Sequence, residues 1–432
     1  MTTTLPGRAP GARPAAPPAA APPAAGAGSG RMLAQRIAVV VAAAGLPLLR
    51  PGGPGNTGPV DFGLLLGLVA AAAWASWSRH ALRLPFVIPV GLLVAGGAVA
   101  ALAHGVGALN SALTLGQDGY VLLWGVALAN LASRPLLLRT GVRAIGVSGA
   151  AWAAVMLVGV LGGVPALSGV TAREGSRASL TLGDPNLAAN YFLVALLVLR
   201  AAGYPRRAAL RWPCCLVLLA AIFFTGSNGG ALTLLLATAV GAVLRLARTR
   251  GVGPAIALAL VLGAGAGAAV SVVDLDAVAL RAQTSIPALR DSIGRQSESS
   301  SSRDALAAEG ARLWWREGLV GVGPGRTKAE LTRLQAPYVK EAHDDYLAAF
   351  LERGVIGGGG ILLLVGALLV RAQRVAVRPL SAAYAEILPR PELLAAAVVA
   401  VLASASLYEV LHFRHAWALF GTVAGVDLWG RR

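Results

Sequence analysis

The sequence predicts an all-α polytopic membrane protein with about 12 transmembrane helices and one large outer loop. The mean hydropathy of its 432 residues is +0.67. Only 13% of the residues are charged. Apolar runs of about 20 residues recur along the chain, and this is the length that crosses a hydrocarbon core of roughly 30 Å. These observations exclude a soluble globular domain.

Twelve apolar runs are the predicted spans. In chain order they cover residues 32–49, 62–78, 84–103, 116–132, 144–163, 186–202, 213–226, 229–245, 253–273, 345–370, 391–410 and 412–429. They divide the chain into a disordered cytoplasmic tail (1–31), transmembrane helices 1–9 (32–273), a large outer loop with short helices (274–343) and transmembrane helices 10–12 (344–432). The tail is rich in Pro and Ala and has no apolar periodicity, so it cannot bury a core. No cleavable signal peptide stands at the start, and the first apolar run is expected to stay as an anchor helix.

The distribution of Lys and Arg predicts the orientation of the spans, because short cytoplasmic loops carry an excess of these residues. With the N-terminus in the cytoplasm, the cytoplasmic segments carry 22 of the 37 Lys and Arg residues. The outer segments 164–185 and 274–343 hold most of the others, and long translocated segments are largely exempt from the rule. Both termini are therefore expected in the cytoplasm, with the unusual polar motifs on the outer face.

The net charge of +17 would suggest nucleic acid as a partner of a soluble chain. In a membrane protein, cytoplasmic loops explain it better, so no nucleic-acid partner is expected. The two cysteines, Cys214 and Cys215, are adjacent within an apolar run. They indicate neither a disulfide framework nor a metal site.

Two short polar motifs come first among the outer segments. In REGSRASLTLGDPNLAANYF (173–192), Asp184 and Pro185 are typical of a helix start, and Asn186 follows them. Arg177 in the same segment could bind a lipid phosphate or make an ordinary headgroup contact. In TGSNGGAL (225–232), small residues allow a tight helical hairpin, and Ser227 and Asn228 could also present polar atoms to an outer cavity.

The large loop carries two further motifs. SSRDALAAEGARLWWREG (301–318) begins like a capping box and continues as a helix. Arg303 and Arg312 are nine residues apart, so they point in opposite directions from one helix. GVGPGRTK (321–328) superficially resembles a nucleotide-binding glycine loop, but no strand precedes it. A tight turn beside the membrane, with Arg326 and Lys328 available to anions, is the better interpretation.

The segment EAHDDYLAAFLERGVIGG (341–358) crowds ionisable residues at the start of a predicted span. Charges at a membrane boundary are costly unless they are paired or used. A lone histidine there is more often structural, but flanking carboxylates would orient or charge the imidazole of His343. With arginines in the neighbouring loops, we interpret His343 as catalytic. His412 and His415 could form a second polar site, and Glu352 is interpreted as a helix-packing residue.

The order of these motifs resembles that of the O-antigen ligase/polymerase family of bacterial surface-polysaccharide glycosyltransferases. The resemblance covers residues 170–372, and its most specific part is AHDDYLAAFLERGVIGG, where the family usually has H-N-x-Y-L…E-x-G-x-x-G. It implies an enzyme of the bacterial inner (plasma) membrane that takes a glycan from a polyprenyl-diphosphate-linked donor. The acceptor is a hydroxyl of a lipid or polysaccharide, membrane lipid surrounds the enzyme, and no metal or other cofactor takes part.

The resemblance also implies roles for particular residues. It makes His343 the catalytic residue, Arg303, Arg177 and Arg312 the diphosphate ligands, and Asn186, Ser227, Asn228, Arg326, Asp344 and Tyr346 possible substrate contacts. Arginine suits a diphosphate leaving group because its charge is permanent and its contacts are bidentate. A histidine can take the proton of the acceptor hydroxyl near neutral pH.

Two positions depart from the family pattern. Asn228 stands where the family commonly has arginine, which removes one expected phosphate ligand. Asp344 stands where asparagine is expected, and its negative charge should favour the protonated form of His343.

Several alternatives remain open from the sequence. A polysaccharide polymerase or a protein O-oligosaccharyltransferase would share the same motifs. Carboxylates at Glu341, Asp344 and Asp345 keep a metal-dependent mechanism open. A multi-pass transporter is the main alternative of another class, although it would place its polar residues near the middle of the membrane.

Overall fold

A computed structural model of the chain describes residues 25–50, 57–78, 80–105, 108–285, 290–291, 296–336, 339 and 344–431. All regular secondary structure in these ranges is helical, which confirms the predicted α class. Most of the predicted N-terminal tail, residues 1–24, lies outside the described residues.

The helices of the described residues follow one another along the chain with short connections. They are α1 (Ala25–Gly45), α2 (Pro59–Trp77), α3 (Val87–Ala103), α4 (Ala108–Leu131), α5 (Pro135–Leu161), α6 (Pro165–Ser168), α7 (Pro185–Ala202), α8 (Ala208–Phe224), α9 (Asn228–Arg250), α10 (Val252–Val272), α11 (Leu275–Gln283), α13 (Gln296–Glu317), the 3-10 turn η3 (Gly318–Val320), α14 (Thr327–Arg333), α15 (Asp345–Val377), α16 (Ala382–Ile387), α17 (Glu392–Ser404) and α18 (Arg414–Trp429).

Each predicted span overlaps one helix, namely α1, α2, α3, α4, α5, α7, α8, α9, α10, α15, α17 or α18. Within the described part of the chain, 7 helical segments are long and apolar enough to cross a membrane, and they belong to α2, α4, α5, α7, α9, α10 and α15. Helices α3, α8 and α17 are apolar but shorter. The protein is therefore a multi-pass helical membrane protein, and the number of twelve crossings stays a prediction.

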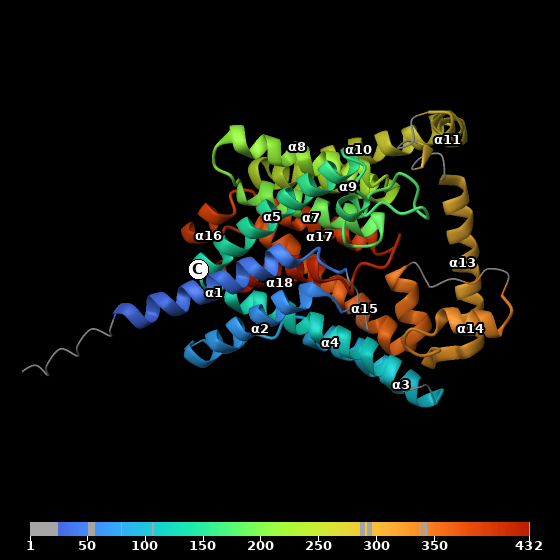
Figure 1. The fold of residues 1–432 in the computed structure, drawn as a ribbon, viewed down its shortest axis with the longest axis horizontal. Helices are drawn as coiled ribbons and strands as arrows, with labels where there is room; N and C mark the ends of the chain where they lie inside the picture. Colours follow the sequence, from blue (N-terminus) through green and yellow to red (C-terminus); the bar gives the residue numbers. More distant parts are fainter. Residues whose placement is uncertain are drawn as a thin grey trace, which may run out of the picture.

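The helices form a bundle with two distinct ends. Figure 1 shows α11, α13 and α14 gathered at one end, and α16 and the C-terminus at the opposite end. We call the first of these the α13 end. Helix α7 lies at the centre of the bundle, where 83% of its span is buried. Only 6% of the α10 span is buried, and α9 is the helix on which α10 mainly packs. Helix α7 is thus enclosed by protein, whereas α10 presents its apolar surface to lipid.

Helix α15 is broken at Gly354, whose backbone has φ 60° and ψ −162°. The break frees backbone carbonyls that need donors, because no water is available at membrane depth. The turn that follows α13 supplies these donors. The Val322 amide donates to the Leu351 carbonyl at 2.8 Å, and the Gly323 amide donates to the Glu352 carbonyl at 3.1 Å. The GVGPG segment is thus a tight turn that caps the first half of α15.

Small residues let the second half of α15 pack closely on α3. A methyl group at Gly96 of α3 would lie 2.5 Å from the Arg353 carbonyl oxygen. A methyl group at Gly360 of α15 would lie 2.8 Å from the Pro89 carbonyl oxygen. Close backbone approach of this kind is a common source of helix association in membranes.

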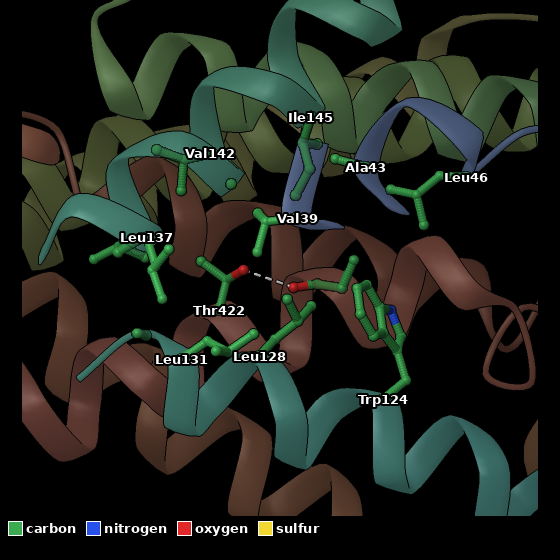
Figure 2. A pocket seen from close by; sticks show the side chains of 14 residues that line it. Val39, Ala43, Leu46, Trp124, Leu128, Leu131, Leu137, Val142, Ile145 and Thr422 are labelled. Atoms are coloured by element: carbon green, nitrogen blue, oxygen red, sulfur yellow. Dashed lines mark hydrogen bonds between the residues drawn. The ribbon is translucent and has the colours of Figure 1, made fainter. Parts of the chain in front are cut away.

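The bundle also contains a small apolar gap between α1, α4, α5 and α18 (Figure 2). Its volume is about 30 Å³, which is the share of one water molecule in the liquid. The Thr422 hydroxyl at its edge donates to the Ala418 carbonyl of its own helix at 2.7 Å. The indole nitrogen of Trp124, another lining residue, is buried and has no hydrogen-bond partner among the described residues. The gap is otherwise lined by apolar side chains and is a packing defect of the core.

The break in α15 predicts a large cost for a side chain at Gly354. In Gly354→Ala the new methyl would overlap the carbonyl groups of Leu319 and Val320, at a positive φ that alanine disfavours. We expect the free energy of unfolding to fall by about 1–3 kcal/mol, measured as a lower melting temperature of the purified protein. The matched control is Gly366→Ala, because nothing lies within 4 Å of a methyl at that position of the same helix. Equal melting temperatures of the two variants would contradict a helix break that requires glycine at position 354.

Candidate functional site

The first two predicted motifs meet at the N-terminal ends of α7 and α9. The Asn186 side-chain oxygen accepts from Arg177 Nη2 at 3.1 Å and from the Ser227 hydroxyl at 2.8 Å. Arg177 Nε donates to the Thr225 carbonyl at 3.2 Å, and Arg177 Nη1 pairs with Glu174 at 3.1 Å. We call Arg177, Asn186 and Ser227, with their partners Glu174 and Thr225, the amide cluster.

Local sequence explains why these side chains come together. Asp184 caps α7 by accepting from the Asn186 amide at 2.6 Å, with Pro185 in the first turn. Ser227 caps α9 by accepting from the Gly230 amide at 3.0 Å. A methyl at Gly230 would lie 2.6 Å from the Ala189 side chain, so only glycine allows the two helix starts to lie this close.

The third motif begins with the paired aspartates, and each has a structural partner. Asp344 is the N-cap of α15 and accepts from the amides of Tyr346 and Leu347 at 2.8 and 3.0 Å. The Asp345 carboxylate accepts from the amides of Val410 and Leu411 at 2.7 and 3.0 Å. One aspartate therefore positions the helix start, and the other holds the loop between α17 and α18.

That loop, residues 405–413, joins the three motifs. The Asp345 amide donates to the Ala405 carbonyl at 2.8 Å. A methyl at Gly229 of α9 would lie 3.1 Å from the Tyr408 ring. Next to the loop, the Ser404 hydroxyl accepts from the Asn190 amide of α7 at 3.0 Å. The start of α15 therefore bonds this loop, the start of α9 packs against it, and α7 bonds the end of α17 directly before it.

The other predicted site residues lie apart from the amide cluster or outside the described residues. His343 lies outside the described residues, as do Glu341 and the side chain of Arg303 in α13. Arg312 of α13 is 72% exposed and pairs with Glu309 of the same helix at 2.6 Å. Arg326 is the N-cap residue of α14.

Two predicted substrate contacts lie at helix starts. Tyr346 is turned inward, and its hydroxyl donates to the Leu402 carbonyl at 2.7 Å. Asn228 is the exposed first residue of α9.

The segment that follows α11 also touches the amide-cluster loop. The Asp291 carboxylate accepts from the Ser176 amide at 2.9 Å and from the Ser176 hydroxyl at 2.7 Å. These hydrogen bonds to the charged form lower the pKa of Asp291 to about 2. The contact places residues of the predicted large loop beside the Arg177 segment at the α13 end.

A cavity of about 270 Å³ lies beside the start of α15, on the other side of the 405–413 loop. Its ionisable lining residues come from three helices and the 405–413 loop. They are Asp118 of α4, Lys328 of α14, Asp345, Glu352 and Arg353 of α15, and Glu409 and His412 of the loop.

Several of these residues were not predicted as site residues from the sequence. Glu352 does support packing, because its carboxylate accepts from the Gly325 amide at 2.7 Å and from the Thr327 hydroxyl at 2.8 Å. Asp118 and Arg353 form an ion pair across α4 and α15. The available signal was a single carboxylate inside the apolar run 116–132 and a single arginine inside 345–370.

The open metal-dependent alternative gains no support from the described residues. They contain no group of three His, Cys, Asp or Glu side chains arranged to hold a metal ion. Both aspartates of the pair are instead engaged with backbone amides, as described above.

Comparison with known families bears on residues 213–364, which match the family model described as O-antigen ligase. No curated protein matches the chain. The matched range runs from α8 to the middle of α15 and includes the hairpin turn, α13, the glycine-rich turn and the paired aspartates. The resemblance predicted from the motifs is thus found independently, and residues 213–364 are similar to the O-antigen ligase family.

Proposed function

We propose that the protein transfers a glycan from a polyprenyl diphosphate carrier to an acceptor hydroxyl on the outer face of the bacterial inner (plasma) membrane. One observation carries the proposal. The starts of α7, α9 and α15 bear the three family-like motifs. Helices α9 and α15 begin against the loop 405–413, and α7 bonds Ser404, the last residue of α17, directly before this loop. Motif residues that are far apart in sequence are thereby brought to one end of the bundle.

His343 is the proposed general base. It directly precedes Asp344, whose carboxylate caps α15. The residue that follows His343 is therefore held in place by the start of this helix. The acceptor hydroxyl is a weak nucleophile until its proton is removed, and an imidazole operates near neutral pH. The negative charge of Asp344 beside His343 favours the imidazolium that forms after proton transfer.

The proposed diphosphate ligands are Arg177, Arg303 and Arg312. Arg177 is held by three described partners, so its guanidinium is already oriented before a substrate arrives. Helix α13 carries the other two arginines and lies with α11 and α14 at one end of the bundle (Figure 1). Fixed positive charge near the leaving group stabilises the negative charge that develops on the diphosphate, and no metal is required in this scheme.

The orientation belongs to the same proposal. With both termini in the cytoplasm and twelve crossings, the α13 end faces outward. Residues 274–343 then form the outer loop between spans nine and ten. A lipid-linked glycan donor in the outer leaflet would meet the starts of α7, α9 and α15 at the surface of the membrane. The hydroxyl acceptor approaches the same face from the aqueous side.

The variant His343→Ala tests the proposed base. In a full-length enzyme supplied with a polyprenyl-diphosphate glycan and candidate acceptors, His343→Ala should reduce release of polyprenyl diphosphate by about 10²–10⁴-fold, the range for loss of a general base. His104→Ala is the matched control, since His104 is exposed at the end of α3 on the same predicted face. Unchanged turnover in His343→Ala would overturn the mechanism. Absence of release by the unaltered enzyme would instead favour the transporter alternative.

The variant Arg177→Lys tests the proposed diphosphate ligand. Arg177→Lys keeps the charge but loses the planar fork, so we expect the KM for the donor to rise about tenfold while the KM for the acceptor stays unchanged. Arg173→Lys, an exposed position in the same loop, is the control and should leave both constants unchanged. Equal increases in both KM values would show that Arg177 only supports the loop.

The acceptor that turns over fastest also decides between ligase, polymerase and protein-glycosylating activity.

A further inference from the structure

Arginines gather at the end of the bundle opposite the α13 end, where α16 lies (Figure 1). Four of them surround the turn between α7 and α8, although they are far apart in sequence. We call these four the arginine cluster: Arg200 of α7, Arg211 of α8, Arg245 of α9 and Arg390 shortly before α17.

Three members of the arginine cluster meet at the turn between α7 and α8. The Arg390 amide donates to the carbonyl of Ala201, the residue after Arg200, at 3.2 Å. Arg211 Nη1 donates to the Gly203 carbonyl of the turn at 3.2 Å. Backbone contacts thus hold the arginines of α7, α8 and the α17 start around one turn.

Helix α9 adds the fourth arginine. A methyl at Gly241 would lie 3.1 Å from the Leu393 side chain, so α9 packs closely on the start of α17. Arg248 Nη1 pairs with Glu392 Oε2 at 3.0 Å. Arg245 stands between Gly241 and Arg248, about one turn from each. It therefore lies beside the same start of α17 as Arg390 does.

The charge of the arginine cluster is not neutralised by carboxylates of the described residues. Glu392 is engaged by α9, and Glu386 of α16 pairs with Arg139 at 3.2 Å and Arg206 at 2.8 Å. No member of the cluster forms an ion pair within the described part of the chain. Burial, together with the charges of the other three members, lowers the pKa of Arg390. Like charges are thus held close together without a counter-ion from the protein.

The arginine cluster adjoins apolar side chains that face lipid. Trp212 of α8 is 55% exposed, and the Arg200 guanidinium lies 5.2 Å from the centre of its ring. Leu210 and Leu216 of the same helix are 56% and 62% exposed. Tryptophan is enriched where the hydrocarbon core meets the lipid headgroups. The cations therefore stand at headgroup level, beside a surface that acyl chains can cover.

An excess of arginine on a cytoplasmic face needs no ligand by itself. Arg31 and Arg36 of α1 illustrate that case: they are exposed at the same end, and they diverge by about 140° on one helix. The arginine cluster differs because four elements converge on it. A phosphate between these guanidinium groups would relieve their repulsion, and arginine makes bidentate contacts to phosphate.

We propose that the arginine cluster binds the headgroup of an anionic phospholipid, whose acyl chains lie along the exposed side chains of α8. Four cations match two phosphates, so cardiolipin, which has two, should bind more tightly than phosphatidylglycerol, which has one. Basic pockets between membrane helices commonly hold such headgroups. The bound lipid would tie the α7–α8 turn to the start of α17 and stabilise the fold. The site lies at the end of the bundle away from the amide cluster and does not depend on the proposed function.

The test measures lipid binding to the full-length protein. The protein is purified in detergent, freed of lipid, and titrated with cardiolipin, phosphatidylglycerol or the zwitterionic phosphatidylcholine. Native mass spectrometry counts the bound lipids, and the melting temperature reports stabilisation. Cardiolipin should bind most tightly and raise the melting temperature, whereas phosphatidylcholine should not raise it.

Arg245→Gln combined with Arg390→Gln removes two charges of the cluster. Neither side chain makes an ion pair or hydrogen bond to a described residue, so the melting temperature without lipid should stay unchanged or rise. Cardiolipin binding should weaken about thirtyfold, because each basic residue near anionic lipid contributes about a fivefold gain.

The matched control is Arg31→Gln combined with Arg36→Gln. It removes the same charge from the same end of the bundle, and Arg31 also lies over the ring of an exposed tryptophan, Trp77, at 4.5 Å. This variant should bind cardiolipin as the unaltered protein does.

Three results would overturn the inference. They are equal effects of cardiolipin and phosphatidylcholine, equal cardiolipin binding by the two double variants, or stabilisation by inorganic phosphate alone as large as that by cardiolipin. The last result would assign the cluster to a free anion instead of a lipid. Transferase activity is not measured, so failure of this inference and failure of the proposed function are distinguishable.

Discussion

The arrangement of the site depends on one carboxylate, that of Asp345. It accepts two backbone amides of the 405–413 loop, and the amide of the same residue donates to the Ala405 carbonyl. Backbone donors that are shielded from water must find partners inside the protein. Asp345, the first residue of α15, satisfies these backbone amides. The 405–413 loop between α17 and α18 therefore cannot move independently of the start of α15. The start of α9 packs against the same loop, and α7 bonds Ser404 directly before it.

The same physical demand explains the other acidic residue of the motif. The break at Gly354 leaves carbonyls exposed, and the glycine-rich turn supplies amides to them. Glu352 then holds that turn through the Gly325 amide and the Thr327 hydroxyl. A segment that resembles a phosphate-binding loop in sequence is thus a cap for a broken helix. Carboxylates near the site mainly serve backbone donors, while the pair of Asp118 and Arg353 still faces open space.

Much of the fold was predictable, because an apolar run of fixed length is a local signal, and each predicted span overlaps one helix. Helix starts at Asp184 and Ser227 were also local, and their caps are present. The departure at Asp344 has a local explanation as well, since aspartate caps a helix as well as asparagine does. The ion pair of Asp118 with Arg353 was not predictable, because its members are 235 residues apart and only the packing of α4 against α15 brings them together.

In the proposed orientation, the α13 end, where the motifs meet, faces away from the cytoplasm. Single cysteines test it directly after Cys214→Ala and Cys215→Ala remove the native thiols. Arg312→Cys places a thiol on exposed α13, and Arg250→Cys places one at the exposed opposite end of α9. A membrane-impermeant maleimide applied to intact cells should label the first variant, and should label the second only after the membrane is opened. Labelling of Arg250→Cys in intact cells, with Arg312→Cys protected, would contradict the proposed orientation of the α13 end.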